Sequence, residues 1–228
     1  MSLQFDRAAV KSLFRSGNGL FGWVHRFNSQ PAAYAHPSWF DASVPPELFN
    51  VLRRTRRGVN RLSKILLEQN GLCDEACYDF NPPQWRFALL PAEVIQDLTF
   101  YCGLAFQHRR IAGMVDKTVL TGLKESIGER AYAFAIKRAP LLIGRKRGID
   151  LQWDGSSDFG MFARRYGAVY FLSHFRESSR AIAVRLSFKF SRVIARTVVD
   201  RPPDGSGWQL FKRILLHEIE PRWQTLFS

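Results

Sequence analysis

The stretch from Leu90 to Gly144 places the tightest constraint on what this chain can fold into. Its first part, from about Ala92 to Met114, predicts a long helix, because apolar side chains recur at helical spacing along one side of it. Further apolar side chains project from nearly the opposite side, and a helix that is apolar almost all the way round is a buried one; these are Phe100, Leu104 and Ile111. We therefore expect a mainly α fold, a compact multi-helix domain around a buried central helix.

This central helix is not predicted to cross a membrane. Its charge-free run, Leu98 to His108, is far shorter than the roughly 20 apolar residues that a transmembrane helix needs, and so is the run from Tyr166 to Phe175. The first residues lack the uninterrupted apolar region of a secretory signal. Three cysteines do not make a disulfide framework. We expect a soluble protein of a reducing cytoplasm.

At 228 residues with 46% hydrophobic residues, the chain can bury a substantial core. We expect an N-terminal amphipathic segment over residues 1–27 and a single helical domain over residues 28–228, with a loop at 150–160. Gly19 to Trp23 predicts a turn between helices and not a phosphate-binding loop, because no Gly-Lys-Ser/Thr sequence follows it. The proline-containing stretch from Asn28 to Pro46 predicts an ordered connection, since Trp39 and Phe40 can anchor it.

Capping signals divide the later chain into shorter helices. Asp116 is placed to cap a helix that ends near Ser126, and a Ser-x-x-Glu pattern beginning at Ser126 predicts the start of the next one, stopped by Pro140. From Ala181 to Phe190 apolar residues alternate with polar ones, which indicates a strand. A helix ending near Leu186 fits almost as well. The fold class therefore allows one short β element near residues 183–190.

The formal net charge is +13, with 33 basic and 20 acidic residues, and it points to an acidic partner: nucleic acid, an anionic membrane or an acidic protein surface. The densest cluster contains no acidic residue and comprises Arg53, Arg54, Arg56, Arg57, Arg61 and Lys64. This cluster is either an electrostatic patch or a solvated helix face whose acids lie elsewhere in space, and the second explanation is the simpler one. A shorter basic turn follows at Arg145, Lys146 and Arg147.

No catalytic constellation is visible. The five histidines are scattered, with no His-Glu-x-x-His motif and no local triad signature. Cys73 and Cys77 could supply half of a zinc site, but no second Cys/His pair lies at ligand spacing, so we interpret them as ordinary small apolar residues. We predict no catalytic, cofactor-binding or metal site.

Several short segments then stand in a characteristic order. The central stretch contains Gly103-Leu104-Ala105-Phe106-Gln107-His108, then Arg110-Ile111, Val115, Leu120, Leu123, Ile127-Gly128 and Leu141-Leu142-Ile143-Gly144. Before it comes Pro31-Ala32-Ala33-Tyr34-Ala35-His36, and after it come Arg185-Leu186-Ser187-Phe188 and the stretch from Trp208 to Phe227. In order and spacing, from about Pro31 onward, the chain resembles the SctK family (YscK, PscK and relatives) of bacterial type III secretion systems.

The resemblance implies a non-enzymatic adaptor of the sorting platform, at the cytoplasmic face of the bacterial inner membrane. Such proteins link the cytosolic domain of the inner-membrane ring protein (SctD) to the pod protein (SctQ), which holds the SctL stator and the SctN ATPase. The candidate interface residues are Arg53, Arg54, Arg56, Arg57, Arg61, Arg145, Lys146 and Arg147. The alternative is a basic nucleic-acid-binding protein, because the isoelectric point is about 10.2 and the arginines cluster.

Overall fold

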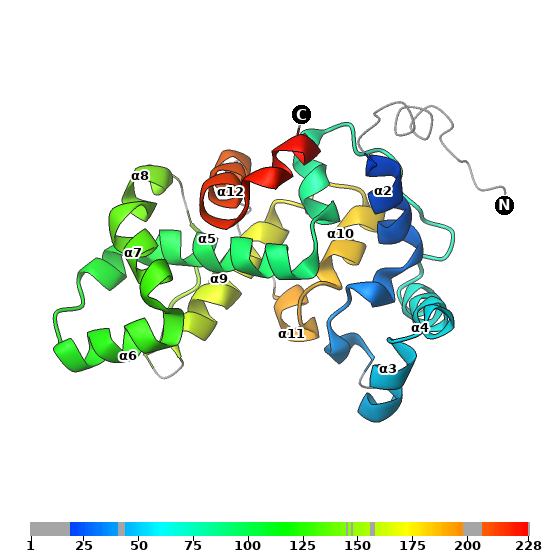
Figure 1. Cartoon of the computed structure of the whole chain (residues 1–228), viewed down its shortest axis with the longest axis horizontal. Helices are drawn as coiled ribbons and strands as arrows, with labels where there is room; N and C mark the ends of the chain where they lie inside the picture. The colour runs from blue at the N-terminus through cyan, green and yellow to red at the C-terminus, as the bar shows by residue number, and fades with distance from the viewer. Residues whose placement is uncertain are drawn as a thin grey trace. The chain divides into compact units, whose positions relative to one another are not determined.

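The computed structural model describes residues 19–40, 44–144, 146, 148–155, 158–197 and 207–227 (Figure 1). Within these ranges every regular element is a helix and none is a strand, so the predicted mainly α fold is confirmed. The chain divides into two compact units. Unit 1 comprises Met1–Ala92, Phe175–Arg196 and Gln224–Ser228, and unit 2 comprises Glu93–His174 and Thr197–Trp223. The boundary expected at residue 27 stays a prediction, since residues 1–18 lie outside the described ranges.

Unit 1 is an assembly of short helices around an aromatic core. They are α2 (Leu20–Ser29), η1 (Pro31–Ala33), η2 (Pro37–Trp39), α3 (Pro46–Leu52), α4 (Arg56–Gln69), η3 (Pro83–Leu89), α10 (Arg180–Ser187) and α11 (Arg192–Ala195). Trp39 and Phe40 are buried in the core, as expected for anchors of an ordered connection. The indole N–H of Trp39 donates to the carbonyl of Phe190 at 2.9 Å, and its ring packs edge-on against Phe188.

Helix α2 corrects the expected turn at Gly19 to Trp23. Gly19 has a left-handed conformation with φ of 67° and precedes the helix, but Gly22 lies inside it. A helical glycine costs up to about 1 kcal/mol relative to alanine. Burial of Leu20, Val24 and Phe27 on one side of α2 outweighs that cost.

Helix α10 shows that the strand alternative near residues 183–190 is wrong. The alternating pattern misleads because two of its basic residues are buried: Arg185 is 1% exposed and Lys189 is 3% exposed. The guanidinium of Arg185 donates to the carbonyls of Asn28, Leu72 and Ala181, and the ammonium of Lys189 donates to those of Ala88 and Leu90. Arg185 lies in α10, and Lys189 lies four residues later in the turn that follows it, where its N–H donates to the carbonyl of Leu186 at 3.0 Å, so both side chains reach the interior. Burial lowers the pKa of Arg185.

Unit 2 is built on α5, the long helix predicted from the sequence. Its helices are α5 (Ala92–Ala112), α6 (Lys117–Ile127), α7 (Glu129–Lys137), α8 (Ala139–Ile143), α9 (Phe159–Ser173) and α12 (Gly207–Ile214), followed by the π-helical turn η4 (Leu215–Ile219). Leu98 is buried on one side of α5, and Phe100 and Leu104 are buried on nearly the opposite side, which confirms the prediction of a helix enclosed on most sides. Figure 1 shows α6, α7 and α8 near the C-terminal half of α5.

Two glycines let α5 and α9 touch backbone to backbone. A Cβ atom on Gly103 of α5 would lie 1.9 Å from the carbonyl oxygen of Ala163, and one on Gly167 of α9 would lie 1.7 Å from that of Thr99. No side chain fits at either position, because 3.4 Å is where ordinary contact begins. This crossing fixes the centre of unit 2.

The helix-capping predictions had mixed outcomes. Asp116 caps α6 as expected, its carboxylate accepting from the N–H groups of Thr118 and Val119. The capping box at Ser126 was wrong: Ser126 lies inside α6, and its hydroxyl donates to Asp158, the residue that caps α9, at 2.7 Å. This hydrogen bond and the N–H of Met161 lower the pKa of Asp158. Helix α7 ends at Lys137, shortly before Pro140, as expected, and Pro140 itself lies in the first turn of α8, where proline is tolerated.

Candidate protein-interface surfaces

The sharp junction between α3 and α4 determines which way the predicted arginine cluster faces. The side chain of Thr55 caps α4 by accepting from the N–H of Gly58 at 3.0 Å. Gly58 is buried against α3, where a Cβ atom would lie 2.1 Å from the carbonyl oxygen of Leu52. Phe49 of α3 and Leu62 of α4 enter the core of unit 1. The charged side chains of both helices are therefore left on the outside.

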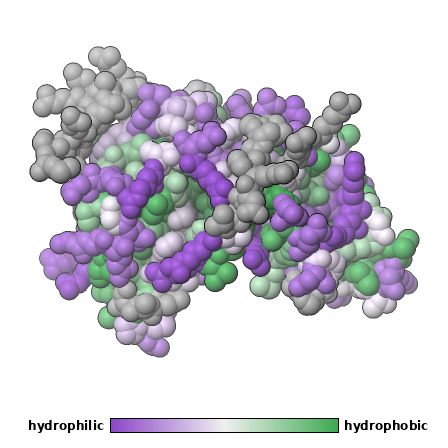
Figure 2. Space-filling view, turned by 180° about the vertical axis from the view of Figure 1, so that it is seen from behind, coloured by the Kyte–Doolittle hydropathy of each residue, from purple (hydrophilic) through white to green (hydrophobic). Residues whose placement is uncertain are grey.

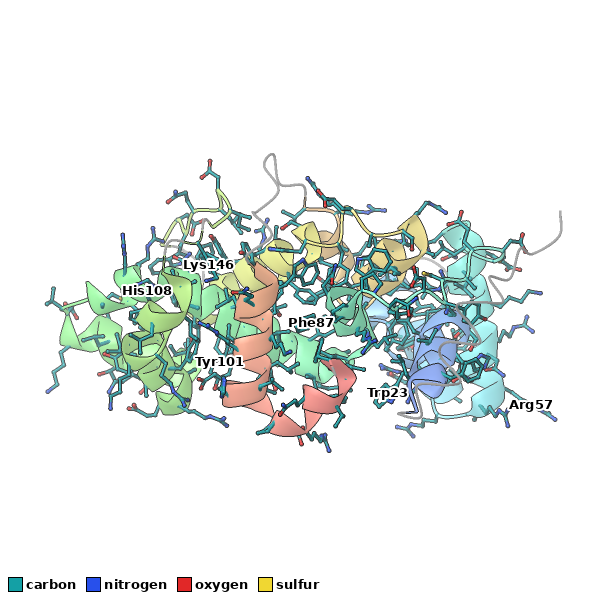
Figure 3. The ribbon with its side chains drawn as sticks, turned by 90° about the horizontal axis from the view of Figure 1, so that it is seen from above. Trp23, Arg57, Phe87, Tyr101, His108 and Lys146 are labelled. Carbon is teal, nitrogen blue, oxygen red and sulfur yellow. The ribbon has the colours of Figure 1, made fainter. Side chains whose placement is uncertain are left out.

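The arginines of the cluster are exposed, and so are two apolar side chains of the preceding helix α3. We call this set of residues the arginine surface and define it as Leu48, Val51, Arg53, Arg54, Arg56, Arg57 and Arg61, all of which are exposed. Leu48 is 48% and Val51 is 61% exposed, one turn apart on α3. Figure 2 shows hydrophilic side chains with hydrophobic patches between them over this part of unit 1. Figure 3 shows Arg57 projecting away from α4.

The positive charges of the arginine surface destabilise helix α4. Arg56 and Arg57 occupy the first turn of α4, where the helix dipole is positive and no acidic residue is present. Arg57 and Arg61 are one turn apart, a spacing at which like charges destabilise a helix by a few tenths of a kcal/mol, about 0.2–0.5. Within the described part of the chain none of the five arginines forms an ion pair. The absence of ion pairs among the described residues fits a solvated helix face as well as an electrostatic patch, so the patch stays a prediction.

Arg53 is the most constrained of these arginines. Its guanidinium donates to the carbonyl of Ala33 at 3.4 Å and lies 5.8 Å from the centre of the Phe49 ring. Lys64, one turn beyond Arg61, pairs with Glu68 at 3.7 Å and marks where charge compensation begins on α4. The exposed Leu48 and Val51 could not be assigned to this surface from the sequence, because either side of so short a helix can face a core.

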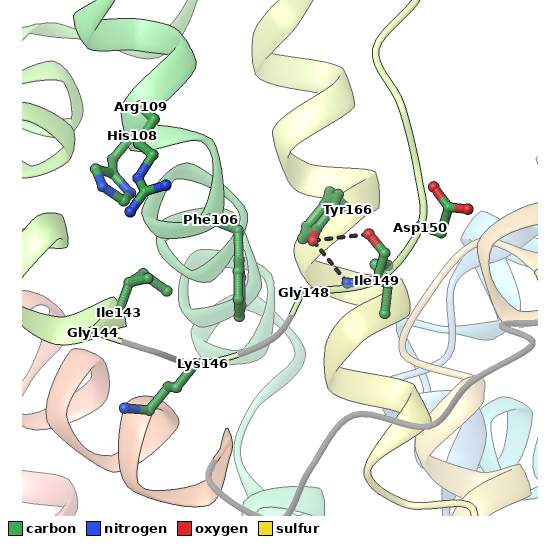
Figure 4. Close-up of a pocket in the computed structure, with 10 residues that line it drawn as sticks. All are labelled: Phe106, His108, Arg109, Ile143, Gly144, Lys146, Gly148, Ile149, Asp150 and Tyr166. Carbon is green, nitrogen blue, oxygen red and sulfur yellow. Dashed lines mark hydrogen bonds between the residues drawn. The ribbon is translucent and has the colours of Figure 1, made fainter.

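The second predicted basic group lies in unit 2, and its described member, Lys146, is half-buried at a pocket. Arg145 and Arg147 lie outside the described residues. The ammonium of Lys146 donates to the carbonyl of Leu142 at 3.2 Å, at the end of α8. The pocket has a volume of about 660 Å³ and brings Lys146 together with His108 and Arg109 from the last turn of α5 (Figure 4).

A rigid aromatic wall closes one side of this pocket. The hydroxyl of Tyr166 donates to the carbonyl of Ile149 at 3.1 Å and accepts from its N–H at 2.9 Å (Figure 4). Burial raises the pKa of Tyr166 to about 12. The nearby Asp150 points away from the basic side of the pocket (Figure 4). The Nδ1–H of His108 donates to the carbonyl of Ala105 at 2.8 Å, one turn earlier on α5.

The remaining candidate chemistry is sparse. Cys73 is exposed, Cys77 is half-buried, and Cys102 is buried in α5, where burial raises the pKa of its thiol. Among the described residues no three His, Cys, Asp or Glu side chains lie close enough to hold a metal ion. None of the helices in the described ranges combines the length and apolar character that a membrane span requires.

Comparison with known proteins identifies the family of this chain. The family model of YOP proteins translocation protein K (YscK) matches residues 23–212. Among solved structures, the chain is similar to the cytoplasmic domain of the T3SS sorting platform protein PscK from P. aeruginosa, with 18% sequence identity, a TM-score of 0.48, and coverage of 85% of this chain and 90% of that one. No curated protein matches. Since the family model spans most of the described chain, the protein belongs to the YscK family.

Proposed function

We propose that this protein is a non-enzymatic adaptor of the type III secretion sorting platform, which links the cytosolic domain of an SctD-type ring protein to an SctQ-type pod protein. The SctL stator and the SctN ATPase would then be its indirect partners. Membership of the YscK family, a family of sorting-platform proteins, is the observation that carries this proposal. Its place would be peripheral, at the cytoplasmic face of the inner membrane.

The arginine surface supports the docking part of this proposal. An adaptor needs surfaces that are already formed in the free protein and whose charged side chains gain ion-pair partners only when another protein binds. Arg54, Arg56, Arg57 and Arg61 meet this description, since they are exposed and form no ion pair within the described ranges. Complementary charge across an interface mainly raises the encounter rate and the specificity. An acidic surface on one of the two partners would relieve the repulsion between these side chains.

A bridging experiment tests the adaptor role. The SctD-type cytosolic domain from the same organism is immobilised, and the SctQ-type protein is applied with and without the full-length chain. We expect SctQ to be retained only when the chain is present. If the SctQ-type protein is retained on the SctD-type domain without the chain, or if neither partner binds the chain, the adaptor role is refuted.

A nucleic-acid-binding function is the second candidate, favoured by the same arginines. A gel-shift titration with duplex DNA and with RNA over a series of salt concentrations distinguishes the two. Submicromolar affinity that falls steeply with salt would favour nucleic acid, because each neutralised phosphate releases counterions. We expect only weak binding that disappears near physiological salt.

A further inference from the structure

The arginine surface combines arginines with exposed aliphatic side chains, and this combination favours an acidic protein over a nucleic acid. Leu48 and Val51 of α3 expose about half or more of their side chains, and the turn and helix that follow carry four exposed arginines that form no ion pair among the described residues. Phosphate groups gain nothing from exposed aliphatic side chains. A surface for single-stranded nucleic acid would instead offer aromatic rings for base stacking, but the aromatic ring within α3, Phe49, is 4% exposed and belongs to the core.

The spacing of these side chains matches a helical partner. Leu48 and Val51 lie one turn apart on α3, and the chain continues with helical hydrogen bonding into the turn, where the N–H of Arg54 donates to the carbonyl of Val51 at 3.2 Å. Arg57 and Arg61 lie one turn apart on α4. Leu48, Val51 and Arg54 therefore follow one another at intervals of three residues along α3 and the turn after it, the spacing at which a partner helix lying along α3 repeats its own side chains.

We propose that the arginine surface binds an acidic amphipathic helix of a partner protein, with its apolar side chains seated on Leu48 and Val51 and its carboxylates paired with Arg54, Arg57 and Arg61. Arginine suits this role better than lysine, because a guanidinium can bind a carboxylate through two parallel hydrogen bonds. This inference rests on the proposed adaptor function for the identity of the partner, but the recognition chemistry can be tested separately.

The test uses the full-length chain and three fluorescent 18-residue helical peptides. One carries leucines along one face and glutamates elsewhere, the second replaces the glutamates with lysines, and the third replaces the leucines with serines. Binding is followed by fluorescence anisotropy at fixed salt. We expect the first peptide to bind the wild-type chain and the other two to bind at least about tenfold more weakly.

Paired variants locate the binding site. Arg57→Ser/Arg61→Ser and, separately, Leu48→Ser/Val51→Ser should each weaken binding of the first peptide by about tenfold. The matched controls lie in unit 2: Lys117→Ser/Lys137→Ser removes the same charge from exposed positions, and Val115→Ser/Val119→Ser removes exposed apolar side chains. Both controls should bind within about twofold of the wild type. Circular dichroism spectra verify that all variants keep their helical content.

Each result decides between named alternatives. Equal weakening by the site and control variants would overturn the inference, since it would mean that the peptide senses only the net charge. Loss of binding in the arginine variant but not in the Leu48/Val51 variant, together with equally tight binding of duplex DNA, would overturn it in favour of nucleic acid. If the peptides behave as expected but the bridging experiment fails, the adaptor role falls and the recognition chemistry stands. If both site variants still bridge the two partner proteins, and if neither variant weakens binding of the first peptide, the recognition chemistry is refuted and the adaptor role stands.

Discussion

The crossing of α5 and α9 predicts that Gly103→Ala destabilises the protein, although alanine is the better helix former. The added methyl group would lie 1.9 Å from the carbonyl oxygen of Ala163, whereas ordinary contact begins at 3.4 Å. The clash is with backbone, which cannot rotate away, so the helices must separate by about 1.5 Å, the difference between these two distances. Overpacking of this kind costs about 1–3 kcal/mol.

The intrinsic preference of a helix for alanine returns at most about 1 kcal/mol of this cost. We expect a net loss near 1 kcal/mol in the free energy of unfolding, about 2 kcal/mol of overpacking less about 1 kcal/mol of helix propensity, which lowers the Tm of a chain of this size by roughly 2–4 °C. Urea unfolding followed by far-ultraviolet circular dichroism gives the free energy, and calorimetry gives the Tm.

Gly122→Ala provides the matched control. Gly122 lies within α6, and a Cβ atom there would meet nothing within 4 Å, so this variant should gain up to about 1 kcal/mol. The double variant Gly103→Ala/Gly167→Ala should cost less than the sum of its parts, because the first substitution already separates the helices. If Gly103→Ala unfolds at or above the wild-type temperature, the packing argument is wrong.

Three further substitutions test other contacts. Lys189→Met should cost about 1–3 kcal/mol in urea unfolding, because two buried carbonyls lose their donor; an unchanged midpoint would refute the role of that ammonium. Tyr166→Phe should cost a similar amount, about 1–3 kcal/mol, because the N–H of Ile149 loses its acceptor. The pKa of Tyr166 is raised to about 12 in the folded protein, so its stabilising effect is complete below the ordinary tyrosine pKa of about 10 and is lost as the pH rises to 12. The Tm of Tyr166→Phe should therefore fall less steeply than that of the wild type over this pH range. Because the pKa of Asp158 is lowered in the folded protein, its carboxylate stabilises the fold at pH values above the usual aspartate pKa, and this effect is lost as the pH falls through the pKa of the folded state. Asp158→Asn should therefore flatten the acid side of the Tm–pH profile.

The long helix could be predicted from the sequence because its signal is redundant. Apolar residues on nearly every side of α5 indicate burial whichever neighbours surround it, and its length excludes a strand. The strand alternative for α10 could not be excluded, because the pattern treats every basic residue as exposed. Only the tertiary structure supplies the carbonyls that make the interior acceptable to Arg185 and Lys189.

The arginine surface was partly predictable for a similar reason. Closely spaced arginines without acids are visible in the sequence, but their lack of partners is a property of the folded chain. The exposure of Leu48 and Val51 follows from the burial of Phe49, which the sequence does not distinguish from its apolar neighbours. The pocket beside Lys146 is also lined by Tyr166 and Ile149, which are 17 positions apart and joined by hydrogen bonds that no sequence pattern shows.

The discontinuous make-up of unit 1 has a consequence for biosynthesis. The carbonyls of Leu72 and Ala88 obtain their donors from Arg185 and Lys189, roughly 100 residues later in the chain. At about 5–20 residues per second, a ribosome needs about 5–20 s to deliver them. Unit 2 is discontinuous as well, since α12 follows only after the stretch Phe175–Arg196 of unit 1 has been made. During synthesis α2 to α4 should therefore wait for α10 in a form that chaperones can bind.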